Sequence, residues 1–259
     1  MDLPVAEAAE ANDPMHQFVI SSIWNWEPIE GLNLHFTNSS LFMVFTVVAI
    51  TLFMSFAMSG RSLVPGRMQL IAELSYEFIA NMVRDNAGAE GMKFFPFVFS
   101  LFVFVLTANM LGMVPYSFTV TSHIAVTFAL AAFIITIVFV YGLMRNGLKF
   151  FKLFLPSGVP LVLVPLMVPI EIISFLTRPV SLSVRLFANM LAGHTMLKVF
   201  AGFVVNIGAK GGLFVVFAAL PLVGATALIG LEFLVAFLQA FIFSILTCIY
   251  LHDAISPGH

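Results

Sequence analysis

The chain has 259 residues, of which 61% are hydrophobic and only 9% are charged, and its formal net charge is −2. This composition excludes a soluble globular domain and is typical of a protein that lies within a lipid bilayer. The sequence contains neither a basic block nor a glycine-rich phosphate-binding loop, so nucleic acid is not expected as a partner.

The charged residues are distributed unevenly along the chain. Residues 1–40 contain six acidic residues and no lysine or arginine, whereas seven of the 11 basic residues fall in two regions between apolar segments. Because cytoplasmic loops of membrane proteins are enriched in lysine and arginine, we expect the two basic regions on the cytoplasmic side and residues 1–40 on the other side. The seven basic residues are Arg61, Arg67, Arg84, Lys93, Arg145, Lys149 and Lys152.

Residues 41–58 predict the first membrane span, because about 18 consecutive apolar residues are enough to cross the hydrocarbon core.

Residues 68–86 have a different pattern. Ile71, Leu74, Phe78 and Met82 recur at helical spacing, while polar residues share the opposite face. We expect this amphipathic helix to lie along the membrane interface. The alternative is that it packs against the soluble part of a partner.

Residues 94–144 predict a transmembrane hairpin with spans over 94–114 and 124–144, joined by a short connection. Lys93 and Arg145 flank this hairpin, so both of its ends are expected on the cytoplasmic side.

Residues 161–251 contain two apolar runs of about 40 residues each, over 161–207 and 213–251. Since a perpendicular span needs about 20 residues, each run forms either two spans or one long, steeply tilted helix. Nothing inside the runs resembles an aqueous loop, and Pro179 and Pro221 could simply kink a helix. We therefore expect two long tilted helices that form a hairpin, and an all-α membrane protein as the fold class.

The first long helix carries a polar stripe centred on Arg185. At about 100° per residue, five polar residues fall within about 40° of it, over a length of about 27 Å. An arginine near mid-membrane costs about 2.5–3.5 kcal/mol on insertion scales. No acidic residue lies within two turns of Arg185, so its counter-ion is expected from elsewhere, including another protein. Arg178 could instead pair with Glu171 on the same face. The five residues are Glu171, Ser174, Arg178, Ser181 and Asn189.

Groups that can exchange protons lie on other helix faces. His194 points about 180° away from Arg185, while Glu232, Gln239 and Tyr250 share one face of the final helix. Arginine stays protonated and cannot relay protons, but a fixed charge can attract a carboxylate and repel a passing proton. Imidazole and carboxyl groups accept and release protons. The alternative for His194 and Glu232 is that they are packing residues.

The segments SLSVRLFANMLAGH, over 181–194, and LEFLVAFLQAFIFSILTCIYL, over 231–251, resemble subunit a of the F-type ATP synthase, the proton-channel stator. A weaker likeness extends through VRDNAG near Arg84, FVFVLTANMLGMVPY over 102–116 and DPMHQF from Asp13. The resemblance implies two inclined helices that curve around a rotating ring of c subunits. Further implied partners are b-type subunits of the peripheral stalk, the remainder of the complex and membrane lipid.

The resemblance also implies residue roles. Arg185 resembles the stator arginine that faces the ionisable carboxylate of the ring and separates two aqueous half-channels. The order of His194 and Glu232 is exchanged relative to many bacterial members, as in mitochondrial and related bacterial forms, which leaves open which of them receives the proton first. The other residues of the implied proton path are Glu171, Ser181, Asn189, His194, Glu232 and Gln239.

The same resemblance implies a bacterial inner-membrane protein with proton rather than sodium coupling and without a catalytic centre in this chain. The charge distribution predicts a periplasmic N-terminus, and the C-terminus is expected on the cytoplasmic side. Neither a cofactor nor a metal is expected. The single cysteine, Cys248, excludes an intramolecular disulfide and a multi-cysteine metal site.

Two alternatives come from other functional classes. A secondary transporter could bind an anionic substrate through Glu171, Arg178 and Arg185, but it would be expected to show repeats or broken helices, and neither is visible. A membrane enzyme or haem protein would need helix-borne ligand spacings such as HExxH, which are absent.

Overall fold

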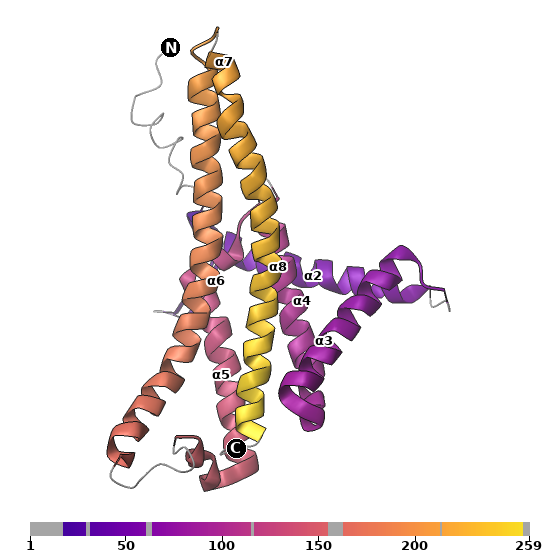
Figure 1. The fold of residues 1–259 in the computed structure, drawn as a ribbon, viewed down its shortest axis with the longest axis vertical. Helices are drawn as coiled ribbons and strands as arrows, with labels where there is room; N and C mark the ends of the chain where they lie inside the picture. Colours follow the sequence, from indigo (N-terminus) through magenta and orange to yellow (C-terminus); the bar gives the residue numbers. More distant parts are fainter. Residues whose placement is uncertain are drawn as a thin grey trace. The chain divides into compact units, whose positions relative to one another are not determined.

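The computed structural model describes residues 18–29, 32–60, 64–114, 117–154, 163–212 and 214–255 (Figure 1). Within these residues, five helical segments are long and apolar enough to cross a membrane. This confirms the predicted class, an all-α protein that passes the membrane several times. The five segments are Asn38–Ser59, Arg67–Gly112, Ile124–Asn146, Val164–Gly208 and Val215–Ile255.

The helical elements follow one another with short connections. The order is α2 (Asn38–Ser59), α3 (Arg67–Gly91), η2 (Met92–Phe94), α4 (Phe95–Gly112), η3 (Val120–Ser122), α5 (Ile124–Asn146), η4 (Gly147–Phe154), α6 (Val164–Gly208), α7 (Phe214–Phe217) and α8 (Ala219–Ile255).

A β-hairpin precedes α2, and the sequence analysis did not expect it. Strands β1 (Ser22–Ile29) and β2 (Leu32–Thr37) pair antiparallel. Asn38, the first residue of α2, joins this hairpin to the helix, since its Nδ2 donates to the Val19 carbonyl at 3.1 Å and its Oδ1 accepts from the Ser21 amide at 3.3 Å. The exception to the all-α class therefore lies in the polar N-terminal segment.

Two threonine hydroxyl groups of α2 are satisfied within their own helix, as a lipid environment favours. Thr46 Oγ1 donates to the Phe42 carbonyl and Thr51 Oγ1 to the Val47 carbonyl, both at 2.8 Å. A hydroxyl that bonds to the carbonyl four residues earlier leaves no free polar group on the apolar surface.

Each of the two C-terminal apolar runs forms one long helix. α6 has 45 residues and continues through Pro169 and Pro179, and α8 has 37 residues. Gly211 and Gly212, at φ of 69° and 60°, form the turn between α6 and α7, because positive φ favours glycine.

The chain divides into two packing units. The first unit comprises the described residues within 1–46, 107–123 and 186–238. In it, the C-terminal half of α6 and the N-terminal half of α8 lie side by side and antiparallel (Figure 1). A buried hydrogen-bond network accompanies them, in which Asn109 Nδ2 donates to the Ala236 carbonyl at 3.4 Å. Thr121 Oγ1 donates to Asn109 Oδ1 at 2.8 Å.

The second unit comprises the described residues within 47–106, 124–185 and 239–259. Its buried centre includes Phe150, whose ring packs edge-on against Phe139 with ring centroids 5.5 Å apart. Asn146 Nδ2 donates to the Ala254 carbonyl of α8 at 2.7 Å, and Arg145 forms an ion pair with Glu90 of α3. Side-chain contacts thus connect α3, α5 and α8 within this unit.

The predicted interfacial segment 68–86 lies within α3. Of the apolar residues that suggested it, Ile71 and Leu74 are exposed, whereas Met82 is buried. The ring of Phe78 lies 5.9 Å from that of Phe102 and 5.7 Å from that of Phe241. The apolar face of this helix therefore packs on α4 and α8 in part.

Gly142 lies where α5 packs on η4, and a Cβ at this position would overlap the buried ring of Phe150. We expect Gly142→Ala to lower the free energy of unfolding by about 1–3 kcal/mol, because the ring has no space into which to move. Denaturant unfolding of the purified protein in detergent measures this change. Gly202→Ala is the control, because nothing lies within 4 Å of a Cβ there. Equal losses in the two variants would contradict the expectation.

Candidate functional site

Arg185 lies on an exposed part of α6 in the second unit. The local pattern explains this placement, since Ser183 and Met190, which are buried, lie about 160° and 140° around the helix from Arg185. None of the ion pairs found among the described residues involves Arg185. In the part of the chain that the structure describes, the Arg185 guanidinium thus has no acidic partner.

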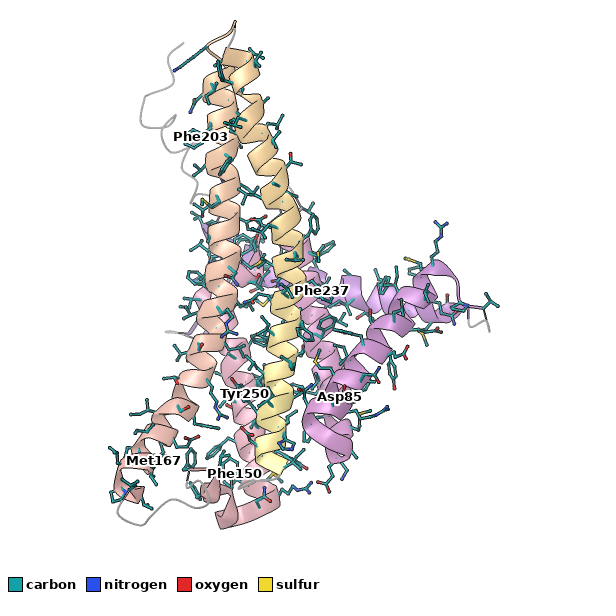
Figure 2. All side chains as sticks on the ribbon, viewed as in Figure 1. Asp85, Phe150, Met167, Phe203, Phe237 and Tyr250 are labelled. Carbon is teal, nitrogen blue, oxygen red and sulfur yellow. The ribbon has the colours of Figure 1, made fainter. Side chains whose placement is uncertain are left out.

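Arg178, seven residues earlier on α6, has a different environment. Its Nη1 lies 3.1 Å from Asp253 Oδ2, so its partner is Asp253 and not Glu171. Its guanidinium carbon also lies 4.9 Å from the ring centroid of Tyr250 and 5.6 Å from that of Phe175. Figure 2 shows Tyr250 on the C-terminal half of α8. Asp253 thus balances the charge of Arg178, and the two aromatic rings contact its guanidinium group.

The remaining predicted residues of the second unit differ in exposure. Ser181 is exposed and Glu171 is half-buried on α6, whereas Gln239 is buried on α8. The neighbouring Ser183 is buried as well, and its hydroxyl lies 3.4 Å from that of Thr127 on α5. Ser181 and Arg185, four residues apart, therefore share the open face of α6.

His194 and Glu232 meet in the first unit, although 38 residues separate them (232 − 194). His194 Nδ1 lies 3.9 Å from Glu232 Oε2, and the two side chains are 10% and 14% exposed. The structure therefore brings together the imidazole and the carboxyl group that the sequence singled out as proton-exchanging groups. Asn189, on the same stretch of α6, is exposed.

Gly193 makes this close approach possible. A Cβ at Gly193 would overlap Glu232 Oε1, so any side chain there would push the carboxyl group away from α6. Both carboxyl oxygens of Glu232 and Nε2 of His194 are buried without a hydrogen-bond partner among the described residues. Because buried polar atoms are nearly always satisfied by protein or water, we expect water to reach this pair.

The sequence analysis did not predict two of the polar contacts. Asn109 is fully buried within an apolar run, which is itself a signal, but its bond to the Ala236 carbonyl joins residues 127 positions apart. Asp253 follows the last apolar run, and nothing in the periodicity of α8 identifies Arg178 as its partner. Among the described residues, no group of three His, Cys, Asp or Glu side chains could hold a metal.

Comparison with known proteins agrees with the resemblance seen in the two long helices. The model of a family described as ATP synthase A chain matches residues 40–252. ATP synthase subunit a of Allorhizobium ampelinum is 63% identical over 250 residues, which cover 96% of this chain and 99% of the relative. The subunit a of Agrobacterium fabrum is 63% identical over 249 residues, which cover 96% of this chain and 100% of the relative. The subunit a of Mesorhizobium japonicum is 61% identical over 254 residues, which cover 97% of this chain and 100% of the relative.

Nearly the whole chain is thus covered at a level of identity that preserves both fold and role. The chain belongs to the ATP synthase A chain family, and it is accordingly a proton-transport subunit of the membrane sector of ATP synthase, whose catalytic centre lies in other subunits.

Proposed function

We propose that this chain is the stator that guides protons to and from a ring of c subunits, and that Arg185 separates two aqueous half-channels. The observation that carries the proposal is an exposed arginine on an apolar helix, without an acidic partner in the described chain. A negative charge next to Arg185 would remove much of the cost of placing the guanidinium in the membrane. An ionisable carboxylate of the neighbouring c-ring would supply this charge.

The permanent charge of Arg185 accounts for both of its proposed tasks. It stabilises the ionised form of each ring carboxylate that arrives, which favours release of the proton into the outlet path. It also repels any proton that would pass directly from one half-channel to the other. A membrane potential of 100 mV supplies about 2.3 kcal/mol for each charge moved, so a separation of the two paths is needed to couple this energy to rotation.

The His194–Glu232 pair is assigned to one half-channel. His194 Nδ1 and Glu232 Oε2 lie 3.9 Å apart, and the polar atoms that are buried without a partner among the described residues would be satisfied by water, which can carry a proton between the two groups. Asn189 and Gln239 are assigned to the region around Arg185. Glu171 and Ser181 lie earlier on α6 and are assigned to the other half-channel.

The proposed orientation follows from the basic segments. The connection between α2 and α3 and the segment after α5 face the cytoplasm, the N-terminal segment 1–40 is periplasmic, the C-terminus is cytoplasmic, and the membrane is the bacterial inner membrane. In this orientation α3 lies along the interface and α6 and α8 are steeply tilted. The proposed partners are the c-ring, b-type subunits of the peripheral stalk and the remainder of the complex.

Replacement of Arg185 tests the central assignment. We expect Arg185→Ala to abolish ATP-driven proton pumping by the assembled complex, because the barrier between the half-channels and the attraction for the ring carboxylate are both lost. Quenching of a pH-sensitive dye in inverted vesicles measures pumping. The control is Lys93→Ala, which removes an exposed positive charge from η2. Normal pumping by assembled Arg185→Ala complexes would rule the assignment out.

The proton-exchange role of the paired side chains is tested separately. We expect His194→Ala to slow passive proton uptake by about tenfold or more, since a positioned acid–base group is lost. Rates are measured from about pH 6 to about pH 9, which brackets the ordinary titration of imidazole. Gly193→Ala should slow uptake as well, because its Cβ displaces the Glu232 carboxyl group, whereas Gly202→Ala on the same helix should not. Wild-type rates for His194→Ala throughout this range would discard the assignment.

We assign Arg178 a structural role and no part in the proton path. We expect Arg178→Ala and Asp253→Ala to destabilise the protein less than additively when combined, with a coupling of about 1 kcal/mol for this partly exposed pair. Thermal unfolding of the four proteins of the cycle measures the coupling. Assembled variants should keep pumping protons, unlike Arg185→Ala. Additive losses, or loss of pumping in assembled complexes, would contradict this role.

A further inference from the structure

The imidazole of His194 has an aromatic neighbour from the beginning of the described chain. The ring of Phe18 lies 6.4 Å from the imidazole ring, centroid to centroid, at an interplanar angle of 32°. This distance is within the usual range of aromatic pairs in folded proteins. Because 176 residues separate the two rings (194 − 18), the contact depends on how the N-terminal segment is held. The proton-exchanging pair therefore has a neighbour that belongs to neither α6 nor α8.

Asn38, the first residue of α2, holds the segment that carries Phe18. Its Nδ2 donates to the Val19 carbonyl at 3.1 Å, and its Oδ1 accepts from the Ser21 amide at 3.3 Å. Its backbone amide also donates to the Ser21 carbonyl at 3.1 Å. These three hydrogen bonds fix the backbone directly after Phe18 to the start of a helix. A segment fixed in this way loses little further entropy when the Phe18 ring packs against the imidazole.

The burial of His194 indicates what the Phe18 ring does. His194 is buried, and its Nε2 has no hydrogen-bond partner among the described residues, whereas Met196 and Lys198 on the same stretch of α6 are exposed. Phe18 is half-buried, so it lies between the imidazole and the outside of the first unit. Its side chain offers no hydrogen bond to water, and the ring therefore limits the access of bulk water to the imidazole.

We propose that Phe18 is a positioning residue for proton exchange by His194. Its ring covers the imidazole, holds it toward the Glu232 carboxyl group and limits the pair to individual water molecules in place of bulk water. Protons from the water phase then reach Glu232 by way of His194. The part of Phe18 in proton exchange rests on the proposed function, whereas the covering of the imidazole is a feature of the fold that is measured separately.

The first experiment measures access to His194 by its reaction with diethylpyrocarbonate. The purified assembled complex in detergent is treated at about pH 8, where an ordinary imidazole is neutral and reactive, and mass spectrometry gives the modification rate of each histidine. His252, which is exposed on α8, is the reference within each sample. We expect Phe18→Ala to speed the modification of His194 relative to His252 by about two- to tenfold, which corresponds to the loss of one aromatic contact.

Matched variants separate the effect of the ring from a general loosening of the segment. Phe18→Tyr retains an aromatic ring and should keep the wild-type rate, and Trp24→Ala removes an exposed ring of β1 and should also leave the rate unchanged. Asn38→Ala should speed the modification, because both side-chain bonds to the segment are lost. Ser40→Ala is its control, since Ser40 lies in the same helical turn and its hydroxyl group bonds to Thr37.

The second experiment tests the part of Phe18 in proton exchange. Passive proton uptake is measured in the wild type, Phe18→Ala, His194→Ala and the double variant. Because water admitted by loss of the ring can exchange protons with Glu232 directly, we expect His194→Ala to slow uptake by a smaller factor in the Phe18→Ala background than in the wild-type background. A ring that only stabilises the fold would leave this factor unchanged. Phe18→Tyr should restore the wild-type dependence on His194.

Two results would overturn the proposal. They are an unchanged modification rate of His194 in Phe18→Ala, and an equal slowing of uptake by His194→Ala in the two backgrounds. Wild-type uptake by His194→Ala itself would refute the proton-path assignment of His194 and, with it, the part of Phe18 in proton exchange. Faster modification of His194 in Phe18→Ala would still establish that the ring covers the imidazole, so the two kinds of failure are distinguishable.

Discussion

A guanidinium group within a membrane-spanning helix must find a counter-charge or remain in contact with water. α6 meets this constraint in two ways within seven residues. Arg178 is matched inside the chain by the Asp253 carboxylate and by two aromatic rings. Arg185 is exposed and has no acidic partner among the described residues. A helix that holds one arginine in place and leaves the other open is suited to a fixed stator with a moving counter-ion, which is the role that we propose for Arg185.

The same two helices bring together the proton-exchanging groups. Gly193 removes the side chain that would separate α6 from the Glu232 carboxyl group, and His194, the next residue, lies 3.9 Å from that group. The missing Cβ is therefore as important for the pair as the two titratable side chains. Nearby, the bond from Asn109 to the Ala236 carbonyl connects α4 to α8 one turn after Glu232. Buried polar contacts of this kind favour one relative position of two helices that apolar packing alone would allow to slide.

Much of the fold could be predicted because lipid imposes simple rules on a sequence. Apolar length predicts spans, and the absence of any aqueous loop favoured one long helix in each C-terminal run, which is how α6 and α8 form. The β-hairpin was not predicted, because it lies in the polar N-terminal segment, where the length rule does not apply. The pairing of Arg178 with Glu171, which the sequence left open, does not form, because helical periodicity describes one helix and gives no information about the side chains of the next.

The sequence by itself determined the membrane class, the helical runs and the polar residues that depart from the apolar pattern, because these depend on composition and on the 3.6-residue period of a single helix. It also carried the family resemblance that full-length relatives confirm. Only the tertiary structure decided which polar groups meet: Arg178 with Asp253, His194 with Glu232, and Asn109 with the Ala236 carbonyl. These pairings depend on the register between helices, which is set by side-chain packing and by the glycines that permit close approach, and no local pattern contains that information.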